Sequence, residues 1–112
     1  MLILVSPFFI RYFTPKNISG LTIFPLIILE KEELKLDKVF INHEMIHILQ
    51  QAELFLIFFF LLYYVEFLIR LLKYRNVQQA YRNISFEREA YENESNYSYL
   101  KTRKWFSFIK YW

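Results

Sequence analysis

Apolar runs of two different lengths divide the chain near residue 30. Before that point, short β-branched and aromatic runs, LILV, FFIRYF and LTIFPLIIL, alternate with turn-forming residues. Such runs are typical of strands, so residues 1–30 predict three short strands that form a small β-hairpin or edge strand. The third run contains Pro25, which favours the edge of a sheet because proline cannot donate a hydrogen bond to a neighbouring strand.

The rest of the chain predicts helices. Gly20 is the only glycine and Pro25 is the last proline, so no helix-breaking residue follows it. Asp37 is a suitable N-cap for the next segment. The expected order is a charged connection at 30–37 and helices at 38–52, 54–75 (apolar), 77–82 and 86–101, followed by a basic and aromatic tail at 102–112. The predicted fold is therefore mainly α (α+β), in a single domain over residues 1–112.

The composition contains more apolar residues than the core of a domain of this length can bury. A chain of 112 residues suits one domain, and a domain of this size buries only about two thirds of its unfolded surface. Hydrophobic residues make up 55% and aromatic residues 21%, which is more than such a core needs. Part of this surface is therefore expected to meet a membrane, a partner or a ligand. The net charge of +3 is small and scattered, which argues against a nucleic-acid partner.

The pentapeptide HEMIH contains both histidines of the chain, His43 and His47. Residues four apart share one helical face, so the two imidazoles can bind one metal ion, and Glu44 projects beside it. This is the HExxH signature, in which zinc lowers the pKa of water towards ~7 and the glutamate acts as general base. The chain contains no cysteine, so nitrogen and oxygen must hold any metal. We therefore expect a zinc site with both histidines as ligands and Glu44 as the catalytic base.

A catalytic zinc ion usually has three protein ligands and one open position. Because the chain has no third histidine, the third ligand is expected to be a carboxylate. Glu53 lies six residues after His47, but that spacing rotates it by about 240° round the helix, well off the metal-facing side. In the longer pattern HExxHxxGxxH a glycine lets the chain turn back to the metal, and here that position is Gln50. Glu53 is therefore an unfavourable third ligand.

The helix expected at 86–101 offers better candidates for the third ligand. Glu87 and Tyr91 share one face of this helix, and the small Ala90 beside them lets another helix approach closely. Glu87 is the preferred third ligand. Two further glutamates remain as alternatives, Glu94 on the same face and Glu89. Glu89 falls on the other side, together with Glu92, and both are expected to be solvated.

These motifs resemble those of the gluzincin type of zinc metallopeptidase, in which a glutamate from a later helix completes the HExxH site. HEMIH followed by EREA at 87–90 is similar to that arrangement. The chain is also similar to small bacterial proteins with HExxHxxQQ and FExEAY motifs. The resemblance implies a zincin-like fold, with His43, His47 and Glu87 as metal ligands and Glu44 as general base.

The resemblance covers residues 38–95 and departs from the family at Tyr91. Many gluzincins have an aspartate there that orients a ligand histidine, so Glu94 or Asn42 is expected to supply this support. In gluzincins an edge strand along the cleft binds the substrate backbone. By analogy, the run Leu21–Leu29 is the corresponding strand in this chain.

The apolar residues 54–72 are long enough to cross a membrane. A full crossing would place the HEMIH helix and the helix at 86–101 on opposite sides of ~30 Å of hydrocarbon, so the two helices could not share a metal ion. Three polar side chains of the apolar segment, Glu66, Arg70 and Lys73, fall on one helical face. This pattern instead favours a helix that lies on a core or on a bilayer surface.

A continuous helix from 38 to 75 would be ~57 Å long, too long for a compact domain of this size. A bend is therefore expected at 51–53. We expect a compact domain associated with a membrane surface through residues 54–72 and 105–112. Burial of the same segments in an oligomer interface is the alternative.

The sequence thus predicts a zinc-dependent metallopeptidase that hydrolyses peptide bonds in a peptide or protein substrate, with Glu44 as general base. Tyr91 or Tyr97 is the expected hydrogen-bond donor to the oxyanion. The alternative is a non-catalytic membrane-associated or integral membrane protein with a structural or vestigial metal site. The expected location is a membrane, peripheral or integral, and otherwise the cytoplasm.

Overall fold

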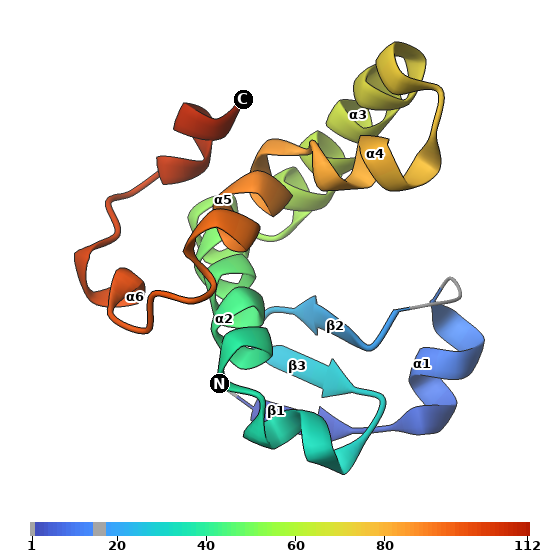
Figure 1. The fold of residues 1–112 in the computed structure, drawn as a ribbon, viewed down its shortest axis with the longest axis vertical. Coiled ribbons are helices and arrows are strands. Elements are labelled where there is room, and N and C mark those ends of the chain that lie inside the picture. Colours follow the sequence, from blue (N-terminus) through green and yellow to red (C-terminus); the bar gives the residue numbers. More distant parts are fainter. Residues whose placement is uncertain (1, 15–17) are drawn as a thin grey trace.

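The computed structural model describes residues 2–14 and 18–112, so residues 1 and 15–17 of the predicted strand region lie outside it. The described chain is mostly helical with one three-stranded sheet (Figure 1). In chain order the elements are β1 (Leu2–Val5), α1 (Pro7–Phe13), β2 (Gly20–Ile23), β3 (Leu26–Leu29), the 3-10 helix η1 (Glu32–Leu36), α2 (Lys38–Glu53), α3 (Ile57–Tyr74), α4 (Val77–Arg82), α5 (Ser85–Asn93), α6 (Tyr99–Thr102) and the 3-10 helix η2 (Ser107–Tyr111). The predicted class, mainly α with a small β element, is confirmed.

The sheet has the order β1-β3-β2, with β3 parallel to β1 and antiparallel to β2. The run LTIFPLIIL is therefore a hairpin of two strands, and the prediction of one strand was wrong. Pro25 lies in the turn between the strands, where it interrupts no ladder, so its prediction within an edge strand was also wrong. Of the predicted edge strand Leu21–Leu29, only the part in β2 lies at an edge.

The run FFIRYF belongs to helix α1, which contradicts the strand predicted there. Ser6 caps this helix, because its Oγ accepts a hydrogen bond from the backbone nitrogen of Phe9 at 3.2 Å. Pro7 follows at the first helical position, where its missing N–H costs nothing. These two start signals outweigh the β propensity of the aromatic residues.

Helix α2 occupies Lys38–Glu53, and the Asp37 side chain caps it by accepting from the backbone nitrogen of Phe40 at 3.1 Å. The chain then bends by 112° into α3, slightly later than the predicted 51–53. Phe55 and Leu56 make the bend with positive φ angles of 55° and 64°. Within the described residues, no helix alone has the length and apolarity to cross a membrane, whereas α2 and α3 taken together meet that criterion as a bent pair.

The helix predicted at 86–101 is interrupted after α5 and resumes only as the short α6. Asn42 on α2 explains the interruption. Its side-chain nitrogen donates to the backbone oxygens of Asn93, Glu94 and Asn96, at 3.3, 2.9 and 3.1 Å. These carbonyls are thereby satisfied without a further helical turn, so α5 ends against α2.

Two apolar clusters hold the elements together. One lies between the sheet and α2 and is built on Ile27, Leu29 and Ile48. The other joins α3, α5 and the tail through Phe59, Ile84, Phe86 and Phe108. Helix α2 contacts both β2 and α5, so its polar residues lie where the sheet, α3 and α5 meet (Figure 1). At this junction β2 approaches α2 closely at Gly20, where a Cβ atom would lie 2.7 Å from Phe40 Cζ.

Candidate metal centre

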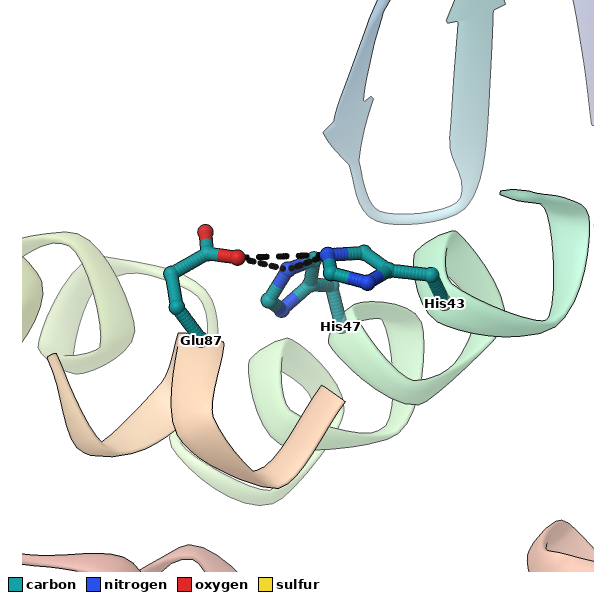
Figure 2. A group of neighbouring side chains, drawn as sticks. All are labelled: His43, His47 and Glu87. Carbon is teal, nitrogen blue, oxygen red and sulfur yellow. Dashed lines mark hydrogen bonds and ion pairs between the residues drawn. The ribbon is translucent and has the colours of Figure 1, made fainter. Parts of the chain in front are cut away.

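Three buried side chains point their ligand atoms at one another where α2 meets α5 (Figure 2). His43 and His47 lie one turn apart on α2, and Glu87 lies in the first turn of α5. The distances from Glu87 Oε1 to His43 Nε2 and to His47 Nε2 are both 3.2 Å, and the two Nε2 atoms are also 3.2 Å apart. The structure thus brings together the three residues predicted as metal ligands.

This triangle fits a tetrahedral metal ion. With metal–ligand bonds of ~2.1 Å, neighbouring ligand atoms of a tetrahedral site lie ~3.4 Å apart. All three separations of 3.2 Å are close to that edge length. Two imidazole nitrogens and one carboxylate oxygen could therefore hold such an ion as three of its ligands.

The charges at the centre favour a cation. Burial lowers the pKa of His47, but Glu87, Glu44 and the hydrogen bond with Gln50 together outweigh burial and raise this pKa to about 9. Burial similarly raises the pKa of Glu87, but the two histidine rings hold it well below its usual range. The other oxygen of Glu87 accepts a hydrogen bond from the Tyr63 hydroxyl at 2.7 Å. A positive charge is therefore stabilised among these atoms, whether a proton or a metal ion carries it.

Gln50 determines which nitrogen of His47 carries the proton. Gln50 Nε2 donates to the Phe86 backbone oxygen at 3.1 Å and to Glu89 Oε1 at 2.9 Å. Gln50 Oε1 must then be the acceptor towards His47 Nδ1, which lies 2.7 Å away. With this proton held on Nδ1, it is Nε2 that gives up its proton and turns a lone pair to the centre when a metal ion binds. The glutamine that replaces the expected glycine is thus a support for a metal ligand.

His43 has the equivalent support from α5. Its Nδ1 lies 3.0 Å from Glu94 Oε2, so Glu94 orients the ring, as predicted for Glu94 or Asn42. Asn42 instead binds the carbonyls at the end of α5. Tyr91, at the position where the resemblance expects aspartate, packs its ring edge-on against His43 with the centroids 4.5 Å apart.

Glu89 is fully buried, so the prediction that it is solvated was wrong, whereas Glu92 is exposed as predicted. Arg103 from the tail explains the difference. Its Nε donates to Glu89 Oε2 at 2.6 Å, and its terminal nitrogens donate to the two oxygens of Glu53 at 2.8 and 2.9 Å. Both carboxylates are thus occupied by Arg103, and neither reaches the metal centre. Glu53 is no ligand, in agreement with its predicted orientation.

Glu44 lies beside the centre, where the edge of the sheet holds it. The Thr22 hydroxyl of β2 donates to Glu44 Oε2. Gln51 fixes β2 in this place, since its Nε2 donates to the Thr22 backbone oxygen at 2.7 Å and its Oε1 accepts from the Phe24 backbone nitrogen at 2.6 Å. The position of Glu44 therefore depends on contacts between α2 and β2.

Glu44 lines two cavities, of about 240 and 730 Å³. The smaller is also lined by His47 and Glu87, and the larger by His43. Both have aromatic walls that include Tyr81, whose pKa is raised by burial and by the nearby Glu87. Together they form a cleft over the metal centre, which we call the central cleft.

Of the tyrosines predicted as oxyanion donors, Tyr91 lines the larger cavity, whereas Tyr97 is 56% exposed at the surface. Sequence reasoning missed Tyr63 and Tyr81, which line both cavities. It also missed the contact of Gln50 with His47, although the sequence places Gln50 one turn after His47 on the same helix. The tyrosines had no such local signal, because they come from α3 and α4.

In comparisons with known proteins, the chain matches no family model, no curated protein and no solved structure.

Proposed function

We propose that this protein is a zincin-like, zinc-dependent metallopeptidase. The observation that carries the proposal is the triangle of ligand atoms, 3.2 Å on each side, beside Glu44 in the central cleft. Two histidines and one glutamate are a ligand set found in catalytic zinc sites, which leave a fourth position open. The HEMIH helix and a glutamate from a later helix supply this set, in line with the gluzincin resemblance.

The residues around the centre have complementary roles in hydrolysis. Zinc, when bound, would polarise the scissile carbonyl and acidify a water molecule. Glu44 is placed to accept the proton of that water and to pass it to the leaving nitrogen. Thr22 orients Glu44 through its hydroxyl. The hydroxyl groups of Tyr81 and Tyr91 are candidate donors to the oxyanion, because both side chains line the cleft.

The outer edge of β2 supports a peptide substrate. Leu21 and Ile23 alternate with Gly20 and Thr22 along β2. The Glu30 backbone nitrogen donates to the Ser19 oxygen, so every second residue from Ser19, namely Leu21 and Ile23, directs its backbone groups towards β3. Gly20 and Thr22 therefore direct their backbone groups outward, and both residues line the cleft. The Thr22 oxygen already accepts from Gln51 Nε2, so an extended peptide would add to this edge through Gly20 and the Thr22 N–H, beside Glu44.

The test is to measure zinc content and peptide hydrolysis for wild type and three variants. We expect about one zinc per chain in wild type, and loss of zinc and activity in Glu87→Gln. Glu44→Gln should keep its zinc while hydrolysis falls by ~10²–10⁴-fold, because only the general base is removed. Glu92→Gln is the matched control, since Glu92 is exposed on the same helix, and it should behave as wild type.

Two outcomes would overturn the proposal. Absence of zinc from wild type after zinc is supplied would contradict the metal centre itself. Retention of zinc without any hydrolysis that depends on Glu44 would instead favour the alternative, in which the metal site is structural or vestigial. Unfolding of Glu87→Gln would be detected by circular dichroism, and His43→Gln then serves as the second ligand variant.

A further inference from the structure

Helix α3 exposes an apolar face along its whole length. Its buried residues, Phe59, Glu66 and Arg70, lie on one side. The other sides carry exposed large apolar residues, which are Ile57, Phe58, Phe60, Leu61, Leu62, Tyr64, Val65, Leu68, Ile69 and Leu72. A continuous apolar surface of this length is unusual in a soluble monomer and indicates an external partner.

The tail packs on α5 and also contacts α3. The Phe106 backbone nitrogen donates to Glu53 Oε2 at 2.6 Å, just before α3 begins. Phe108 joins the apolar cluster that contains Phe59 of α3, and the Arg70 guanidinium lies 5.2 Å from the centroid of a Trp112 ring. Contacts thus connect the tail to the end of α2, to the apolar cluster that includes Phe59, and to Arg70 of α3. Four large apolar residues of the tail are exposed: Trp105, Phe106, Ile109 and Trp112.

The charges of this surface are all positive. Between residues 54 and 75 the only acidic side chain is Glu66, which is 2% exposed and accepts hydrogen bonds from the backbone nitrogen and the hydroxyl of Ser85. Residues 101–112 contain no acidic side chain. The exposed cations of the two segments are Lys73, Arg75, Lys101, Lys104 and Lys110. The two segments therefore combine exposed apolar, tryptophan and cationic side chains. An exposed acid beside the tail is Glu92 of α5, which lines a cavity with Lys110 and Trp112.

We propose that the outward face of α3 and the tail, together called the α3–tail surface, bind the interface of an anionic lipid bilayer. Apolar side chains would enter the boundary of the acyl chains, tryptophans would lie at headgroup depth, and the lysines would contact anionic headgroups. A second copy of the chain fits less well. A symmetric dimer through this surface would bring identical cations together, and the two segments themselves expose no acidic side chain to balance them.

The same surface reaches the central cleft. Phe60 and Tyr64 are exposed on α3 and also line the larger cavity. A bilayer bound to α3 would therefore lie next to the mouth of the cleft. If the proposed peptidase function holds, on which this step rests, the substrates are peptide segments at a membrane surface.

The binding is tested by flotation of the full chain with two kinds of vesicle, phosphatidylcholine alone and phosphatidylcholine with about a third phosphatidylglycerol. Wild type should bind the anionic vesicles more tightly. Leu72→Glu places an acid on the proposed surface and should weaken this binding by ~tenfold or more. Leu36→Glu is the matched control, because Leu36 is 85% exposed, against 81% for Leu72, but lies on η1. It should bind as wild type does.

A second variant tests the charges. Lys104→Gln combined with Lys110→Gln should lower binding to anionic vesicles by ~tenfold and leave binding to neutral vesicles unchanged. Equal binding by Leu72→Glu and Leu36→Glu would overturn the proposal. So would a dimer in lipid-free buffer, seen by light scattering, that Leu72→Glu dissociates, since the occupant would then be a second copy. Glu44→Gln should bind vesicles normally, so failure of the lipid proposal and failure of the peptidase proposal are distinguishable.

Discussion

The junction of α2 with α5 and the outward face of α3 reverse the usual distribution of polarity. At the junction, polar side chains are buried, and His47 and Glu87 are each less than a tenth exposed. On α3, apolar side chains are exposed from Ile57 to Leu72. Folded proteins more commonly bury apolar side chains and expose charged ones. Two neighbouring regions of the described chain therefore depart from the rule in opposite directions.

The difference lies in where each region finds its partners. At the junction, every buried ligand has a protein partner: Glu94 for His43, Gln50 for His47 and Tyr63 for Glu87. Among the described residues, the only buried side-chain nitrogen or oxygen without a partner is Arg70 Nε. The junction thus satisfies its polar groups internally, with room for one cation, whereas the α3 face must be covered from outside.

The largest effect of a single substitution is expected at Arg103. Arg103→Met would leave the carboxylates of Glu53 and Glu89 buried without their cation, and should lower the free energy of unfolding by ~3–5 kcal/mol. Lys101→Met, an exposed change in the same segment, should alter it by less than ~0.5 kcal/mol. Urea denaturation of both variants measures the difference. Equal stability would show that the tail does not hold α2 and α5 together.

The metal-free protein should lose stability in alkali. His47 has a pKa of about 9 in the folded chain and an ordinary value of 6.5, so the protonated form is stabilised by folding. This stabilisation is complete below pH 6.5 and is lost as the pH rises through about 9, with a magnitude on the order of 3 kcal/mol at most. Unfolding of chelator-treated protein at several pH values tests it. Zinc-loaded protein is the control, and the loss should disappear there because zinc replaces the proton.

A smaller effect is expected at Gln50. Gln50→Leu removes the acceptor that directs the His47 Nδ1 proton, so zinc affinity should fall by ~10–100-fold. Competition with a chromogenic chelator measures this affinity. Gln79→Leu on α4 is the matched control, because Gln79 is exposed, and it should keep the wild-type affinity. Identical affinities for the two variants would show that the ring of His47 needs no such support.

The smallest effect is expected on the α3 face. In lipid-free buffer, Leu72→Glu should change the free energy of unfolding by less than ~0.5 kcal/mol, because Leu72 contributes little to the core. Ile46→Ala, at a fully buried position on α2, should cost ~2–5 kcal/mol. Thermal unfolding of both variants makes the comparison. A large loss in Leu72→Glu would mean that the α3 face is part of the fold and not a binding surface.

Much of the centre was predictable because its signals are local. The spacing of His43 and His47 places them on one face of α2 wherever that helix packs. The same reasoning preferred Glu87 as the third ligand and kept Glu94 and Glu89 as alternatives. The structure assigns Glu87 to the centre, Glu94 to the ring of His43 and Glu89 to Arg103.

By itself, the sequence determined the features that depend on neighbours a few residues apart: the HEMIH face, the Asp37 cap and the apolar length of α3. Only the tertiary structure separated Glu87 from the alternative glutamates at the histidines and showed which apolar face stays exposed. Both outcomes depend on distant partners, such as Tyr63 and Arg103, that reach the junction only after the 112° bend and the return of the tail. A pattern read along one helix contains no information about those partners.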